Sequence, residues 1–212
     1  LYLGLKEGVT QAQMSNALKK GQDASVFLNF IEVLPDDVFV IPAGTPHAIG
    51  RGILLLEQQE TSETTFRYYD WGKLYDGKPR ELHIEDAVAC THWDAARGVD
   101  GVNTILRREP AVIEEGSGSS ARHEMLANEK LFSYDRIMLK GGQAHNGNAR
   151  QGMHGLTITE GQLFVVDSGG TRHGPFLTGQ SLIIPSAMGA FRLIAPEGIS
   201  ATVYIGRSDP RG

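Results

Sequence analysis

One histidine of this 212-residue chain stands where a metal ligand would be expected. His47 ends the segment Pro42-Ala43-Gly44-Thr45-Pro46-His47, which follows the short apolar run at residues 38–41. The proline fixes the exit of a strand and Gly44 permits a tight turn, so the imidazole can point into a barrel and bind a divalent metal. The alternative is a histidine that is hydrogen-bonded at a turn, and the spacing alone leaves both interpretations open.

The elements that must position this histidine are predicted from periodicity and turn residues. Residues 10–20 form the clearest helix, because Thr10 and Gln13 have capping-box spacing and Gly21 stands at the C-terminal stop. Further strands are predicted at 38–41, 53–57, 64–69, 131–139, 155–159, 162–167, 180–184, 191–194 and 201–205, and a short helix at 84–89. The turn residues between the later segments favour antiparallel strands in a sandwich or barrel.

The composition excludes several classes of protein. Hydrophobic residues make up 41% and charged residues 21%, as in a folded domain, and 26 Gly with 9 Pro favour many turns. A net charge of −5 without a basic face argues against nucleic acid as a partner, and no apolar run approaches the length of a membrane span. The single cysteine, Cys90, is predicted to be a small buried hydrophobe; it allows no internal disulfide, which fits a cytoplasmic compartment.

An internal repeat indicates a duplicated barrel. Residues 36–47 align with residues 179–190, and each copy has a turn, a short apolar strand, a proline and a turn of small residues. We therefore expect two barrels in tandem. The position of His47 is Ala190 in the second copy, so only the first copy can use it for a metal.

Residues 41–87 resemble the type I mannose-6-phosphate isomerases, which are zinc-dependent enzymes of the cupin superfamily. The resemblance rests on the blocks PAGTPHAI (42–49), Gln58-Gln59, TTFR (64–67), YDW (69–71) and GKPRELH (77–83), and weaker similarity extends over most of the chain. It implies a mainly β fold of cupin-like jelly-roll barrels in tandem, with a small helical insertion near the N-terminus. It also implies one Zn²⁺ per complete catalytic barrel and interconversion of mannose 6-phosphate and fructose 6-phosphate through a zinc-stabilised enediol or enediolate.

The resemblance also implies a domain organisation. Residues 1–97 are assigned to the C-terminal part of the catalytic barrel with a helical insertion at about 10–33, residues 98–120 to a linker, and residues 121–212 to a second cupin-like barrel that lacks the metal histidine. The family's other zinc ligands, a Gln-x-His pair and a glutamate, would precede Leu1. The chain is therefore interpreted as N-terminally truncated, and by itself it is expected to be inactive. A fragment completed by another polypeptide and a degenerate relative are the alternatives.

Two residues take their roles directly from the family. His47 aligns with a zinc ligand, and Arg67 aligns with the arginine that the family assigns to catalysis. A guanidinium is always charged, so it suits stabilising an enediolate or holding a phosphate better than removing a proton. A structural ion pair of Arg67 with Glu63 or Asp70 is the alternative.

Three more residues are candidates for the same site. Glu57 is a candidate acid/base on the next predicted strand, the alternative being a turn-facing or hydrogen-bonded carboxylate. Lys78 and Arg80 could contact the substrate phosphate, unless they are solvated loop charges. His83 is expected to be a structural histidine rather than a support for the metal site.

The second half of the chain offers a weaker metal pattern. The stretch from His154 to Gly161 resembles the first cupin motif, but Ala190 removes the partner histidine, so His145, His154 and His173 are expected to be surface or packing histidines.

The expected partner is a small-molecule sugar phosphate, with no nucleic acid and no membrane. A non-catalytic bicupin fragment that binds a sugar phosphate or a partner is the competing function. An iron-dependent cupin oxygenase ranks last, because only His47 qualifies as a ligand near one barrel.

Overall fold

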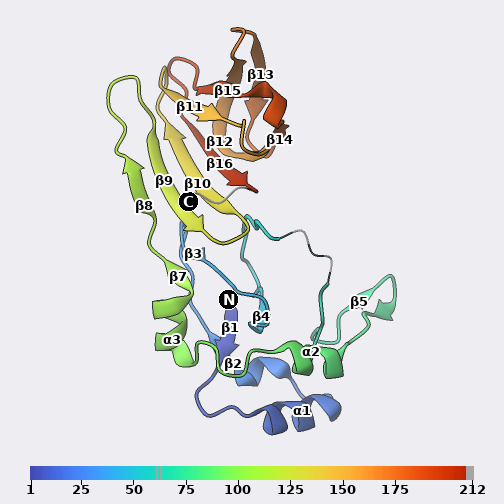
Figure 1. The fold of residues 1–212 in the computed structure, drawn as a ribbon. Helices are drawn as coiled ribbons and strands as arrows, with labels where there is room; N and C mark the ends of the chain where they lie inside the picture. Colours follow the sequence, from blue (N-terminus) through green and yellow to red (C-terminus); the bar gives the residue numbers. More distant parts are fainter. Residues whose placement is uncertain (61, 63, 209–212) are drawn as a thin grey trace. The chain divides into compact units, whose positions relative to one another are not determined.

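The computed structural model describes residues 1–60, 62 and 64–208 in two compact units. Unit 1 is Leu1–Arg108 and unit 2 is Glu109–Gly212. Figure 1 shows the elements along the chain. None of the helices in the described ranges is both long and apolar enough to cross a membrane.

Unit 1 combines short strands with three α-helices. Its elements are β1 (Tyr2–Leu5), α1 (Gln11–Lys19), a 3₁₀ turn (Ala24–Phe27), β2 (Leu28–Phe30), β3 (Val38–Phe39), β4 (His47–Ala48), β5 (Leu74–Tyr75), β6 (Lys78–Pro79), α2 (Ile84–Cys90), α3 (Gly98–Ile105) and β7 (Arg107–Arg108). β1 lies between β2 and β4, while β3 pairs with β7 and β5 pairs with β6, all antiparallel.

The predicted N-terminal helix is confirmed together with its cap. The Thr10 side chain accepts a hydrogen bond from the Gln13 N–H, and the Gln13 side chain accepts one from the Thr10 N–H. The helix buries Met14, Ala17 and Leu18, the face that its periodicity predicts. α2 also forms where a short helix is predicted.

Three expectations for unit 1 are wrong. Residues 53–57 and 64–69 form no strand, because a strand needs a neighbour for its backbone N–H and C=O groups and neither segment pairs with one in the described part of the chain. Leu54, in the first of these segments, is 99% exposed. Cys90 is also exposed rather than packed in a core. The boundary between the two units, after Arg108, falls within the segment 98–120, which contains α3, β7 and β8.

Unit 2 is a curled sheet of antiparallel strands. Its elements are β8 (Ala111–Glu114), β9 (Arg122–Asn128), β10 (Ser133–Leu139), β11 (Ala144–Asn148), β12 (His154–Asp167), β13 (Arg172–Leu177), β14 (Ser181–Ile184), a 3₁₀ turn (Ser186–Met188), β15 (Ala190–Ile194) and β16 (Ala201–Arg207). The sheet order is β11-β15-β12-β16-β10-β9-β8, with β13 and β14 also paired to β12. Every segment predicted as a strand beyond residue 130 overlaps a strand, but the separate strands predicted at 155–159 and 162–167 are one continuous strand, β12.

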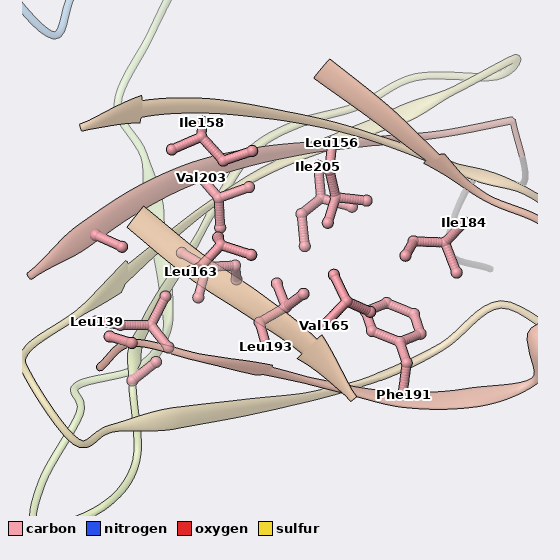
Figure 2. Close-up of a cluster of buried hydrophobic side chains, with 14 of the residues drawn as sticks. Leu139, Leu156, Ile158, Leu163, Val165, Ile184, Phe191, Leu193, Val203 and Ile205 are labelled. Atoms are coloured by element: carbon pink, nitrogen blue, oxygen red, sulfur yellow. The ribbon is translucent and has the colours of Figure 1, made fainter. Parts of the chain in front are cut away.

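The long strand β12 closes this sheet into two layers. Its first half pairs with β14 and β16, and its second half with β13 and β15. The register shifts between Ile158 and Glu160, where the strand changes neighbours. Inward side chains from several strands meet between the layers (Figure 2), and those labelled there are Leu139, Leu156, Ile158, Leu163, Val165, Ile184, Phe191, Leu193, Val203 and Ile205. Unit 2 is thus a jelly-roll with one apolar core.

The bulge in β12 requires a glycine. Gly161 has a φ of 69°, and a Cβ atom there would lie 1.8 Å from the Ser200 carbonyl oxygen. We expect Gly161→Ala to lower the free energy of unfolding by more than about 2 kcal/mol, because left-handed strain costs roughly 1–2 kcal/mol and the Ser200 backbone must also move. Gly155→Ala on the same strand is the matched control, since no atom lies within 4 Å of its Cβ position. Urea unfolding followed by circular dichroism measures both, and equal losses would contradict this role of the bulge.

Candidate active site

The turn that leads to His47 has the geometry expected from its residues. The Thr45 N–H donates to the Pro42 carbonyl at 3.1 Å, and Gly44 has a φ of 77° at the third turn position, as a type II turn requires. A Cβ atom on Gly44 would lie 2.7 Å from the Cys90 carbonyl oxygen, so close packing also needs glycine here. The turn leads directly into β4, which begins at His47.

A backbone carbonyl orients the His47 imidazole. Its Nδ1 lies 2.9 Å from the Thr45 carbonyl oxygen. Because a carbonyl oxygen can only accept, Nδ1 carries the proton, and the lone pair of the neutral ring lies on Nε2. Metal-binding histidines commonly donate their other N–H to a carbonyl or carboxylate in this way. His47 is an exposed residue of unit 1. The residue fits one ligand position of a metal site.

Arg67 lies in an irregular segment whose backbone is held in place. The Arg67 N–H donates to Nδ1 of His83 at 3.4 Å, and the His83 N–H donates to the Arg67 carbonyl at 2.9 Å. The hydroxyl of the next residue, Tyr68, is hydrogen-bonded to that of Thr91 just after α2, and burial raises the pKa of Tyr68. These contacts fix the point from which the half-buried Arg67 side chain leaves the backbone.

A short hairpin follows and carries the other cationic candidates. β5 and β6 are joined by Asp76 and Gly77, whose φ values of 51° and 77° are those of a type I′ turn. Tyr75 is directly opposite Lys78, so their side chains lie on the same face of the hairpin. Arg80 directly follows β6, and its guanidinium lies over the Tyr75 ring, so it belongs to that face as well.

Arg80 is held by three contacts. Its Nε and Nη2 donate to the two carboxylate oxygens of Asp70 at 2.8 and 2.9 Å. Nη2 also donates to the Tyr75 hydroxyl at 2.8 Å, and the guanidinium carbon lies 4.2 Å from the Tyr75 ring centroid. The Asp70 side chain is 10% exposed and that of Arg80 is 39% exposed, so the carboxylate is covered while the guanidinium reaches solvent.

The Asp70 carboxyl is kept ionised by its surroundings. The hydrogen bond from Arg80 is the main cause that lowers its pKa, and the charges of Arg80, Arg67 and Lys73 lower it further against a smaller effect of burial. The same pair raises the pKa of Arg80. Because the folded carboxyl has a lowered pKa, the stabilisation by this pair is present at neutral pH and is lost as the pH falls through that pKa.

The structure brings only some of the predicted site residues together. Arg67 and Arg80 both act on Asp70, and Lys78 lies exposed on the face of Arg80. Glu57 is exposed in an irregular segment. Among the described residues, no hydrogen bond, ion pair or ring contact joins His47 or Glu57 to the other three.

The alternative partner proposed for Arg67 is engaged elsewhere. Asp70 forms its hydrogen bonds with Arg80, and Arg67 affects it only through its charge. The other acidic candidate, Glu63, lies outside the described residues.

The histidines His145, His154 and His173 of unit 2 contact other side chains of the protein. His145 and His154 are buried, with the His145 ring 5.1 Å from that of His123 and the His154 ring 5.6 Å from that of Phe191. His173 Nε2 lies 3.0 Å from an Asp167 carboxylate oxygen. Within residues 1–60, 62 and 64–208, no group of three or more His, Cys, Asp or Glu side chains could hold a metal ion.

Sequence reasoning did not identify Asp70 and Tyr75 as partners of Arg80. The signal that could have found them is Asp76-Gly77 between two short segments, because this dipeptide is typical of a two-residue hairpin turn. A hairpin there would place Tyr75 opposite Lys78 and bring Arg80 back towards Asp70.

Comparison with known proteins shows what the chain is similar to. No family model matches it. The mannose-6-phosphate isomerase ManA of Bacillus subtilis (strain 168) is 41% identical over 193 residues, which make up 87% of this chain and 54% of that protein. A mannose-6-phosphate isomerase of Streptococcus mutans serotype c is 48% identical over 94 residues, or 39% of this chain and 29% of that protein.

The fold agrees with this similarity. The crystal structure of a mannose 6-phosphate isomerase from Bacillus subtilis superimposes with a TM-score of 0.76 and 22% identity, covering 97% of this chain and 59% of that chain. This match confirms the expected fold class, mainly β and cupin-like. The chain spans about half the length of ManA, the longest curated match described above. It is a homologue of the mannose-6-phosphate isomerases.

Proposed function

We propose that this chain carries part of the active site of a zinc-dependent mannose-6-phosphate isomerase. The observation that carries the proposal is the orientation of His47, whose Nδ1 proton is held by the Thr45 carbonyl so that Nε2 can bind a metal. The similarity to the named isomerases supports the reaction, an interconversion of mannose 6-phosphate and fructose 6-phosphate. Unit 1 would belong to the catalytic barrel, and unit 2 would be the second barrel.

His47 alone is not a sufficient zinc site. A catalytic zinc ion takes three protein ligands and keeps one position open. His47 fits one of these positions, and the described residues contain no group of three potential ligands. The other ligands would therefore come from polypeptide outside the described residues, and the isolated chain would be inactive. When bound, zinc would supply positive charge that stabilises a substrate oxyanion.

The residues of this chain would serve the substrate in separate ways. An aldose–ketose isomerase moves a proton from C2 to C1, while the carbonyl passes from C1 to C2 through an enediol. Glu57 would carry this proton, and the Arg67 guanidinium would stabilise the negative charge on the substrate oxygens. Lys78 and Arg80 would hold the phosphate, since both are cations on one face of the hairpin. We place this reaction in the cytoplasm, which the single cysteine favours.

The activity is tested directly on the full-length natural protein. The purified protein, supplied with zinc, is incubated with mannose 6-phosphate, and formation of fructose 6-phosphate is followed by phosphorus NMR. We expect both sugar phosphates at equilibrium from either starting compound. Binding of the sugar phosphate without interconversion would instead support the non-catalytic bicupin.

The role of His47 predicts a loss of metal. We expect His47→Ala to weaken zinc binding by at least about 100-fold, because a ligand contributes more than the outer contacts whose loss costs 10–100-fold. Competition with a chromogenic chelator measures the affinity. His173→Ala, which removes an exposed histidine of unit 2, is the control and should bind zinc like the wild type. Wild-type affinity in His47→Ala would remove His47 from the metal site.

The role of Arg67 predicts a loss of turnover without a loss of metal. We expect Arg67→Ala to lower kcat by about 100–1,000-fold, the range for removing one group that stabilises an oxyanion, while zinc content and the melting temperature stay nearly unchanged. Arg51→Ala removes an exposed arginine of the same unit and serves as the control. Turnover like that of the wild type in Arg67→Ala would exclude the residue from the mechanism.

A further inference from the structure

Two cations, Lys78 and Arg80, lie on the face of the hairpin that carries Tyr75, and the covered carboxylate of Asp70 is bonded to one of them. Arg80 donates two hydrogen bonds to Asp70, and the charges of Arg67 and Lys73 also lower the pKa of this carboxyl. Glu81 follows Arg80, but its carboxylate lies 3.9 Å from His83 Nε2 and is 85% exposed. These cations suit a phosphate monoester, which carries about −1.5 to −2 charges at pH 7.

The contacts of Arg80 leave one edge of its guanidinium for a ligand. Asp70 takes Nε and Nη2, and the Tyr75 hydroxyl also accepts from Nη2. Nη1 carries two further N–H groups, and no hydrogen bond from it to a described residue is formed. A guanidinium held on one side by a carboxylate and stacked on a ring has lost most of its rotamer freedom before a ligand arrives.

We propose that Asp70 and Tyr75 are positioning residues that hold the Arg80 guanidinium with its Nη1 edge directed at the substrate phosphate. This inference rests on the proposed function, in which Arg80 binds that phosphate. The carboxylate fixes the plane of the guanidinium through two parallel hydrogen bonds, and the Tyr75 ring supports one of its faces. Neither residue touches the phosphate itself, so both act through Arg80.

The kinetic test uses Asp70→Asn in the natural protein. An asparagine amide cannot accept both guanidinium hydrogen bonds, so Arg80 becomes mobile while its charge remains. We expect KM for mannose 6-phosphate to rise about tenfold with kcat within twofold of the wild type, because the phosphate is held equally in the ground and transition states. Asp94→Asn makes the same change of charge at an exposed site of unit 1 and should leave both constants unchanged.

Two further variants distinguish positioning from a purely structural role. Tyr75→Phe keeps the ring and removes one hydrogen bond, so we expect KM to rise only about twofold to threefold. In the double variant Asp70→Asn/Arg80→Lys, KM should rise no more than in Arg80→Lys alone, because Asp70 has no effect without the guanidinium. Unchanged KM in Asp70→Asn with a lower melting temperature, or additive effects in the double variant, would overturn the proposal.

A binding measurement separates this proposal from the proposed reaction. Calorimetric titration of the same variants with inorganic phosphate should show about tenfold weaker binding in Asp70→Asn than in the wild type. If the wild type binds phosphate in this way but does not interconvert the sugar phosphates, the isomerase proposal fails and the positioning role stands. If phosphate binds the wild type and Asp70→Asn equally, the positioning role is wrong, whatever the activity.

Discussion

A covered carboxylate needs a cation beside it, and the second half of unit 1 is organised around that requirement. Asp70 is largely withdrawn from water, where an isolated negative charge would be costly. Arg80 meets the requirement with two hydrogen bonds, and it can do so only because the turn at Asp76 and Gly77 returns the chain. The Asp70–Arg80 ion pair therefore needs the turn, and the ion pair holds Arg80 on the face of the hairpin that also carries Lys78.

The metal side of the site follows a different principle. His47 is directed by a backbone carbonyl two residues earlier, so its orientation is set by the local turn. This local turn depends on Gly44, because a Cβ atom at that position would lie too close to the Cys90 carbonyl oxygen. A rigid local unit of this kind presents one imidazole to a metal whose other ligands need not lie close in sequence.

Local signals in the sequence predicted the elements that depend on local interactions. The capping box at Thr10, the turn before His47 and the alternating strands of unit 2 all formed as expected. The segment at 53–57 has the composition of a strand, but strand formation also requires a partner, which composition does not reveal. Likewise, the pairing of Asp70 with Arg80 depends on a hairpin between them, so neither residue alone predicts it. The exposed edge strand β13 was not predicted, because its sequence lacks the alternation of apolar and polar residues that indicates a strand.

The shared strand β12 has a consequence for how unit 2 opens. Its two halves supply backbone hydrogen bonds to four neighbours in both layers, and its inward residues lie in the single apolar core (Figure 2). Neither layer can detach while the other stays intact, so the amide protons of β12 should exchange with solvent only when the whole unit opens. Proteolytic nicking of the native unit should accordingly spare β12 and fall in exposed loops such as the one between β12 and β13.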